Sequence, residues 1–263
     1  MDTPIQVLSI WGDNKTGKST LALTAPKPML HMDLDLGFQR AAPRFQAEIA
    51  SEEITTKRYP VPLQTRPPRI YGIKEVWQTF QADLLKALES KTIKTVVVDT
   101  HTQLWEICRL GFLQEKQENQ FYPDGNMKKI EVNGKYIEQT LRERLLPIEY
   151  GEPNNRMRSI IYAARSMGKI LVLTHYARDI YRQVMTADKG LVEQNLSATT
   201  GEREADAWKY VEGLCDIMVK TSVSVAVPQA KVTLSGVGLS LVGVELTEPT
   251  YDKLVKLVNF ATV

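Results

Sequence analysis

The chain has 263 residues, of which 43% are hydrophobic and 24% charged, and its formal net charge is +2. These values are typical of globular proteins and exclude collagen-like, low-complexity and wholly disordered chains. Because the charge is nearly balanced, any nucleic-acid surface must be local. Two cysteines are too few for a disulfide framework, and no apolar stretch approaches the roughly 20 residues of a membrane helix. We therefore expect a cytoplasmic protein without a membrane partner.

The chain begins with a pattern typical of a parallel α/β sheet. Residues 6–12 (QVLSIWG) form a short apolar run that ends in glycine, which predicts a buried strand. A glycine-containing loop follows, and residues 21–24 predict a helix that stops near Pro26. Another apolar run over residues 29–35 predicts the next strand. This order favours a mostly parallel central sheet with helices on both faces.

Helical and strand-like segments alternate through the middle of the chain. Residues 57–74 carry four prolines and five basic side chains, which predicts a loop or an edge strand. Turn signals over residues 121–135 predict a loop or a small hairpin. Apolar spacing predicts helices over residues 75–90, 104–120, 136–146 and 153–167, and buried strands over residues 95–99 and 170–175.

The last third of the chain changes character twice. Residues 177–205 are polar, and we expect a long mobile loop there. A helix over 206–213 and a strand over 216–221 are predicted next. Residues 223–246 alternate in strand fashion between glycine turns, which predicts an antiparallel extension at the sheet edge, and a final helix is expected over 249–260.

Residues 12–19 match the phosphate-binding motif G-x-x-x-x-G-K-[ST] without a gap. Glycines allow backbone N–H groups to surround phosphate oxygens, and the N-terminus of the next helix adds a favourable dipole. We expect Lys18 to contact the β- and γ-phosphates of a nucleotide and the Ser19 hydroxyl to bind Mg²⁺. The predicted phosphate-binding residues are Gly12, Asn14, Lys15, Thr16, Gly17, Lys18, Ser19 and Thr20.

Asp99 is a second candidate for the same site because it ends the buried strand predicted over residues 95–99. Ligands of parallel sheets bind where the C-terminal ends of the strands meet. We therefore predict that Asp99 holds Mg²⁺ together with Ser19, directly or through water. The histidines show no metal-ligand spacing with each other or with the cysteines, so a zinc site is not expected.

Taken together, these segments resemble the core of a RecA-type ATPase. More narrowly, their order resembles the phage-encoded, RecA-like nucleotide-binding proteins that include ATP-dependent single-strand annealing proteins. The likeness spans about residues 5–222. The segments that carry it are the phosphate loop, Asp33-Leu-Asp35, Val96-Val-Val-Asp-Thr100, Glu149–Met157, Leu171-Val-Leu-Thr-His175 and Thr200–Lys209.

The resemblance implies a fold and roles for individual residues. It implies a RecA-like P-loop NTPase core over residues 1–222, with residues 223–263 forming a C-terminal β-meander and helix on the same domain. Such enzymes carry a catalytic carboxylate, usually glutamate, after the second strand. The aligned residue here is Asp35, one methylene shorter, and Asp33 is an alternative. His175 falls where these proteins place a polar sensor near the γ-phosphate, so Lys18, Asp35 and His175 are the predicted catalytic residues.

Single-stranded DNA is the partner that the resemblance implies, because loops after the central strands of RecA-like proteins contact it. The corresponding segment is 177–205, in which cations stand beside an aromatic ring. Acidic residues make this segment nearly neutral, so a solvated loop without a DNA role is the alternative. The predicted DNA contacts are Arg178, Tyr181, Arg182, Lys189 and Arg203.

The expected function is therefore Mg²⁺-dependent binding and hydrolysis of ATP by a P-loop ATPase that acts on single-stranded DNA in phage recombination or replication. The resemblance also implies a homo-oligomer, as a ring or a filament, and a single-strand DNA-binding protein is a further candidate partner. Two alternatives stay open. One is a nucleotide or small-molecule kinase, and the other is a nucleotide-gated assembly adaptor with little turnover.

Overall fold

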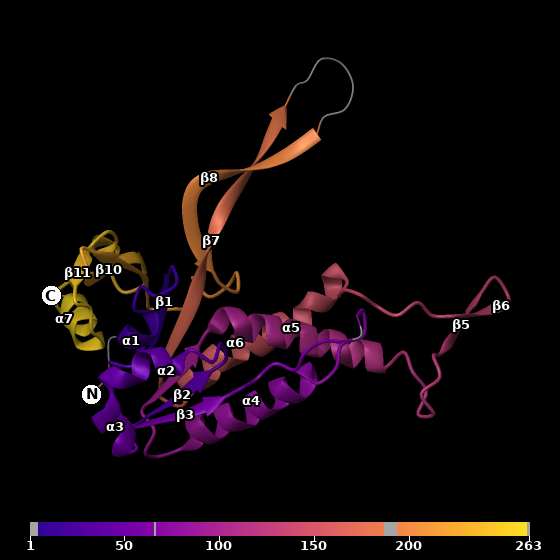
Figure 1. Ribbon diagram of the computed structural model, residues 1–263, viewed down its shortest axis with the longest axis horizontal. Helices are drawn as coiled ribbons and strands as arrows, with labels where there is room; N and C mark the ends of the chain where they lie inside the picture. Colours follow the sequence, from indigo (N-terminus) through magenta and orange to yellow (C-terminus); the bar gives the residue numbers. More distant parts are fainter. Residues whose placement is uncertain (1–4, 66, 187–193, 262–263) are drawn as a thin grey trace.

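A largely parallel sheet forms the centre of the computed structural model (Figure 1), which describes residues 5–65, 67–186 and 194–261. Its neighbouring strands β9, β1, β7, β4, β2 and β3 run parallel to one another. Their bounds are Val7–Gly12 for β1, Met29–Asp33 for β2, Ile54–Arg58 for β3, Thr95–Asp99 for β4, Ile170–Thr186 for β7 and Ile217–Ser224 for β9.

Helices cover both faces of this sheet because alternate strand residues point to opposite sides. Val96 and Val98 belong to an apolar cluster that includes residues of α4, α5 and α6, whereas Val97 belongs to another that includes residues of α1, α2 and α7. The expected α/β class, with helices on both faces, is thus confirmed. The helix bounds are Lys18–Ala22 (α1), Phe38–Ala41 (α2), Gln46–Ala50 (α3), Ile73–Glu89 (α4), His101–Glu118 (α5), Gly151–Ser166 (α6) and Tyr251–Ala261 (α7).

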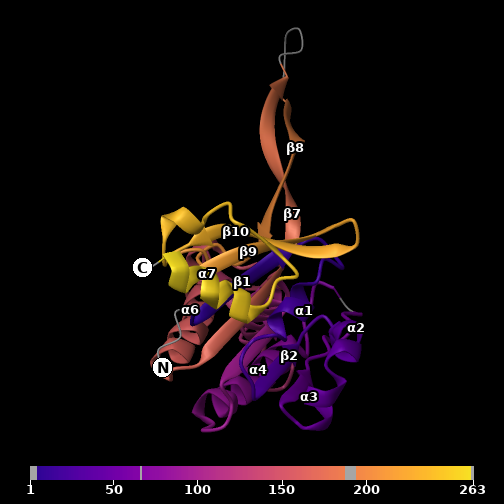
Figure 2. The same cartoon turned by 90° about the vertical axis from the view of Figure 1, so that its left-hand side faces the viewer.

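The C-terminal segment extends the sheet at one edge (Figure 2). Strand β10 (Val227–Ser235) pairs antiparallel with β9, and β11 (Glu245–Thr247) pairs antiparallel with β10, as the sequence predicts. Helix α7 contributes Tyr251 and Leu254 to the apolar cluster that also contains Ala230 of β10. The extension therefore shares a core with the parallel sheet, while a division of the chain at residue 222 stays a prediction.

The expectation of a loop over residues 177–205 is wrong where this segment is described. Beyond His175, which is the last residue of β7 in register with β1, the strand continues away from the body as far as Thr186 and pairs antiparallel with β8 (Gln194–Asp206). Figure 1 shows this projection, which we call the β7–β8 arm and define as residues 176–186 and 194–206. Its two strands satisfy each other's backbone groups by antiparallel pairing.

Two predicted helices are also absent from the described structure. The first residues of the helix expected over 136–146 instead belong to strand β6 (Lys135–Glu138), which pairs with β5 (Lys129–Val132) in a second projecting hairpin (Figure 1). Asn133 and Gly134 both have positive φ, so the chain reverses in a tight turn and Tyr136 lies opposite Glu131.

Residues 207–214 form short turns in place of the helix expected over 206–213. The remaining short helices are the 3-10 segments Ala42–Arg44, Pro147–Tyr150 and Leu239–Leu241.

Candidate functional site

The phosphate-loop motif lies between the end of β1 and the start of α1, as its sequence requires. Gly17 caps α1 with a φ of 93°, a left-handed conformation that favours glycine. At Gly12, a Cβ atom would lie 2.5 Å from the carbonyl oxygen of Thr221 on β9. The Thr16 hydroxyl lies 2.7 Å from that of Thr221. The loop therefore needs its glycines for close packing against β9 as well as for its turn.

Lys18 is buried beneath this loop, with 8% of its surface exposed. Its Nζ donates hydrogen bonds to the carbonyl oxygens of Gly12 at 2.9 Å and Asp13 at 2.7 Å. Burial lowers the pKa of Lys18 from its ordinary value, and the carboxylates of Asp99, Asp13 and Asp35 oppose that effect. A partly desolvated ammonium group at the N-terminus of a helix can attract phosphate oxygens strongly.

Asp99 lies at the end of β4 with both carboxylate oxygens engaged. Its Oδ1 accepts a hydrogen bond from the Thr174 hydroxyl, and its Oδ2 lies 3.2 Å from Nε2 of His31. Burial alone would raise the pKa of Asp99, but the hydrogen bonds from His31, Ser19 and Thr174 hold it below the ordinary value. The carboxylate is therefore ionised at neutral pH.

Asp99 and Ser19 fit the oxygen chemistry of a magnesium site. Ser19 lies close enough to help lower the pKa of Asp99, and both residues line the same cavity, so two hard oxygen donors lie beside the phosphate loop. Mg²⁺ commonly takes one or two protein oxygens and completes its shell with water and phosphate oxygens. Among the described residues, no group of three or more His, Cys, Asp or Glu side chains could hold a metal ion.

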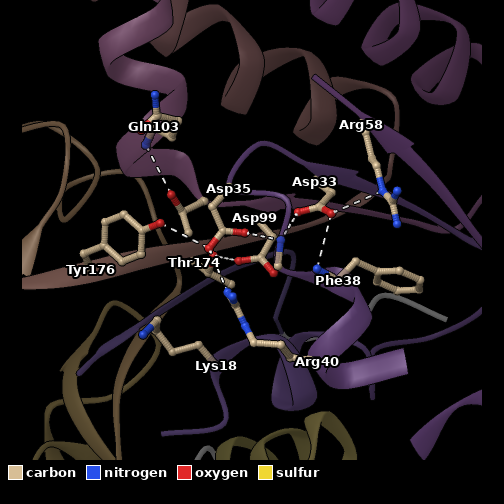
Figure 3. A network of polar contacts seen from close by, with 12 residues as sticks. Lys18, Asp33, Asp35, Phe38, Arg40, Arg58, Asp99, Gln103, Thr174 and Tyr176 are labelled. Atoms are coloured by element: carbon tan, nitrogen blue, oxygen red, sulfur yellow. Dashed lines mark hydrogen bonds and ion pairs between the residues drawn. The ribbon is translucent and has the colours of Figure 1, made fainter. Parts of the chain in front are cut away.

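The two acids near the end of β2 have different surroundings (Figure 3). Asp33 is fully buried, and its oxygens accept hydrogen bonds from the backbone N–H groups of Gly37 at 2.9 Å and Phe38 at 3.2 Å, at the start of α2. Burial raises the pKa of Asp33, although these backbone hydrogen bonds oppose the effect. Asp35 instead lines a cavity beside Lys18. Of the two sequence candidates, Asp35 is thus the one that can reach a ligand.

His175 lies on the opposite side of β7 from its two neighbours. Its side chain is fully buried, with its ring centroid 5.1 Å from that of His101, and it is not among the residues that line the cavity. Burial lowers the pKa of His175 well below its ordinary value, and so does the nearby charge on Lys18. The neighbours Thr174 and Tyr176 instead contact Asp99 and Asp35. The sensor role of His175 stays a prediction.

Tyr176 is a site residue that the sequence reasoning missed. Its hydroxyl donates a hydrogen bond to Asp35 Oδ2 at 3.1 Å, and its side chain lines the cavity. Strand alternation was the signal that could have found it, because Thr174 and Tyr176 share one side of β7. Whether His175 or Tyr176 reaches the cavity depends on which side of β7 faces the phosphate loop.

A cavity of about 1250 Å³ unites these groups. It brings together the predicted phosphate-binding residues from Asn14 to Thr20, the carboxylates of Asp35 and Asp99, and side chains that no motif indicated. Gly12 stands at the base of the loop and is not part of the lining. The additional lining residues are Asp13, Gly37, Arg40, Ala41, Arg44, Thr100, Tyr176, Ala177, Arg203, Asp206, Val223, Ala226 and Pro228.

The predicted DNA contacts fall on the β7–β8 arm but differ in their surroundings. Arg178 pairs with Glu204 across the arm, at 2.8 Å. Arg203 pairs with Asp179 at 2.8 Å and with Asp13 of the phosphate loop, so it ties the arm to the cavity. Tyr181 is 61% exposed. Arg182 belongs to β7, and Lys189 lies outside the described residues.

The family comparison agrees with this geometry. A family model described as an AAA domain (AAA_24) matches residues 5–241, which is most of the chain. The chain belongs to this AAA family of P-loop ATPases. Membership of this family implies nucleotide binding. The cavity around the phosphate loop is the candidate nucleotide site in the described structure. The comparison with curated proteins found no match.

No described helix combines the length and the apolar character needed to cross a bilayer.

Proposed function

We propose that this AAA-family protein binds ATP with Mg²⁺ in the cavity and hydrolyses it, and that its turnover responds to single-stranded DNA. One observation carries the first part. The phosphate loop after β1, Asp35 after β2 and Asp99 at the end of β4 line the same cavity, although they are far apart in the sequence. Ligands of parallel sheets bind at this edge.

Different residues of the cavity are proposed to bind different parts of the ATP triphosphate. The N–H groups of the loop and the N-terminus of α1 face phosphate oxygens, and Lys18 supplies a positive charge to the β- and γ-phosphates. Ser19 and Asp99 hold Mg²⁺, which offsets phosphate charge when bound. Neighbouring Thr174 and His31 keep the Asp99 carboxylate in place through its two oxygens.

Asp35 is the proposed partner of the attacking water. Its carboxylate can accept a hydrogen bond from a water molecule whose oxygen forms a bond to the γ-phosphorus while the bond to the β-phosphate oxygen breaks. Asp33 is less suited to this role because it is fully buried. Asp35 lies in the cavity and Asp33 does not.

The proposed DNA response rests on the β7–β8 arm. The arm continues the central strand that supplies Thr174 and Tyr176 to the site, and it projects from the body (Figure 1). At its root Arg178 and Arg203 are paired with acids, whereas Tyr181 is exposed, which favours Tyr181 as a contact to DNA. Arg182 and Lys189 are proposed as further contacts from the sequence. By resemblance, the cellular role is single-strand annealing in phage recombination or replication. A ring or filament and a single-strand DNA-binding partner also remain proposals.

The first test is ATP hydrolysis with and without single-stranded DNA, using Lys18→Ala as the background control. Removal of the Lys18 charge is expected to lower turnover at least about 100-fold, because the ammonium group neutralises charge on the transferred phosphate. DNA that raises wild-type turnover would support the whole proposal. If single-stranded DNA does not change the turnover, the proposed ATPase activity stands and the proposed DNA response is rejected. If Lys18→Ala hydrolyses ATP as fast as the wild type, the assignment of the phosphate loop is rejected.

Asp35→Asn tests the water-positioning role separately from nucleotide binding. The amide keeps the size of the side chain but is a poor proton acceptor, so turnover is expected to fall about 100-fold while ATP affinity is retained. Phosphate release and titration with a fluorescent ATP analogue measure the two quantities. Unchanged turnover would remove Asp35 from the mechanism.

A nucleotide-gated adaptor with little turnover is the second candidate function. The contacts of Asp35 favour it, because Gly37 N–H and the Tyr176 hydroxyl already donate to the carboxylate, and Arg40 Nη2 lies 3.5 Å away. These partners reduce its capacity to accept a proton from water. Sedimentation velocity distinguishes the two functions: an ATP-dependent change of assembly without phosphate release indicates the adaptor. The kinase alternative gains no support from Arg178, whose partner is Glu204.

A further inference from the structure

Tyr176 lies where β7 leaves the sheet, and its backbone and its side chain are hydrogen-bonded to different parts of the protein. Its backbone N–H donates to the Thr102 hydroxyl at 3.2 Å, in the first turn of α5. Its phenol donates to Asp35 Oδ2 at 3.1 Å, beyond the end of β2 (Figure 3). Two separate strands of the sheet are thus connected across the cavity by this one side chain.

The hydrogen bond acts on a carboxylate that has one other short contact. Asp35 Oδ1 accepts the N–H of Gly37 at 2.8 Å, so the two oxygens are held from different directions. Arg40 is 69% exposed at its side chain and 3.5 Å from Oδ2, which makes it a weaker restraint than the phenol. Without Tyr176, rotation about the terminal bond of Asp35 would be limited mainly by Gly37.

Tyr176 is well suited to act as a permanent donor. Burial raises the pKa of its phenol to about 12, and the charge on Asp35 adds to the effect. The hydroxyl therefore keeps its proton throughout the neutral range. Its ring also lies beside Lys18, whose Nζ is 5.9 Å from the ring centroid, so the phenol borders the region proposed for the terminal phosphates.

We propose that Tyr176 is a positioning residue, which holds the Asp35 carboxylate in the orientation that the attacking water needs. This inference rests on the proposed function, because it assumes that Asp35 takes part in hydrolysis. A carboxylate on the short aspartate side chain must be oriented for its free lone pair to meet the water. Tyr176 does this from the root of the β7–β8 arm, without contacting the reacting atoms itself.

Tyr176→Phe removes the hydroxyl oxygen and keeps the ring that packs beside Lys18. The expected result is a fall in kcat of about tenfold, since a hydrogen bond to a charged group is lost, with the affinity for ATP unchanged. Tyr162→Phe is the matched control, because Tyr162 is an exposed tyrosine on α6 and lies outside the cavity lining. Thermal unfolding with and without Mg²⁺ and ATP establishes that each variant is folded and binds.

A double variant then separates positioning from an independent effect. If Tyr176 acts through Asp35, adding Tyr176→Phe to Asp35→Asn lowers the residual single-turnover rate no further. Losses that multiply would overturn the inference, as would wild-type kcat in Tyr176→Phe or a loss confined to ATP affinity. Failure of the proposed function looks different, because Asp35→Asn by itself would then retain full turnover.

Discussion

Two hairpins leave the body of this molecule, and only one of them is connected to the cavity through the described contacts. The β7–β8 arm continues a central strand of the sheet, whereas the β5–β6 hairpin lies between the end of α5 and the segment before α6 (Figure 1). Both are antiparallel pairs of strands, and the side chains of β6 are exposed. Their local structure alone does not tell them apart.

Their bases differ in what they touch. In the arm, Tyr176 is hydrogen-bonded to Asp35 and Arg203 forms an ion pair with Asp13. Both Tyr176 and Arg203 line the cavity. The β5–β6 hairpin is anchored at Gln120, whose side chain donates to Gln139 and to the Thr140 carbonyl. A hairpin that extends a central strand starts at the ligand-binding edge of the sheet. One that joins two helices does not, so we expect a ligand to influence the first and not the second.

The largest expected effect comes from shortening the arm. Residues 180–202 can be replaced by Asn-Gly, a two-residue turn that then directly joins Asp179 and Arg203, which lie opposite each other in the arm. We expect the DNA response of ATP hydrolysis to be lost, because the proposed contacts Tyr181, Arg182 and Lys189 are removed. Phosphate release with and without single-stranded DNA measures this, and titration with a fluorescent ATP analogue checks that the cavity is intact. Full DNA stimulation in the shortened protein would contradict the proposed role of the arm.

A smaller effect is expected from Arg203→Ala, which cuts the link between the arm and the phosphate loop. The side chains of Arg203 and Asp13 are 41% and 50% exposed, so their ion pair contributes little to stability. Loss of a cation at the cavity should still weaken ATP binding by about fivefold at low salt, and less at high salt because ions screen the charge.

Arg178→Ala is the control for this experiment, because Arg178 pairs with Glu204 on the same arm but does not line the cavity. Titrations of both variants with the fluorescent analogue at two salt concentrations provide the comparison. Equal affinities for the two variants would show that the contact with Asp13 has no special influence on the nucleotide.

The smallest effect is expected from removing the β5–β6 hairpin. Lys128 and Gln139 are already joined by a backbone hydrogen bond of 3.2 Å, so Asn-Gly can replace residues 129–138 between them. Turnover and its DNA response should stay within about twofold of wild type, as for surface changes remote from a site. A loss of DNA response equal to that of the shortened arm would mean that the two hairpins are functionally alike.

Errors in the sequence predictions concentrate in these same two hairpins. The polar composition of residues 177–205 indicates exposure to solvent, but it cannot distinguish a loop from a ladder that satisfies its own backbone groups. Over residues 136–146 the apolar positions suggested a helix, although the Asn133-Gly134 turn folds the chain back as β6. In each segment, pairing with another strand overrides the local pattern.

The sequence by itself determined the phosphate loop and the class of fold. A phosphate loop is contiguous, so its glycines, Lys18 and Ser19 carry their geometry in one short segment, and buried strands are apparent from their unbroken apolar runs. It also indicated Asp99 at the end of one strand and Asp35 close to the end of another, and both line the cavity, while their roles stay predictions.

Only the tertiary structure decided which neighbours of those acids face the cavity. Tyr176 reaches it and His175 does not, because alternate residues of β7 point to opposite sides and the packing of the helices fixes which side is which. Arg203 meets Asp13 across 190 residues of sequence because the arm returns to the end of β1. Such contacts depend on strand order and register, which are set by the packing of the whole sheet and not by any one segment.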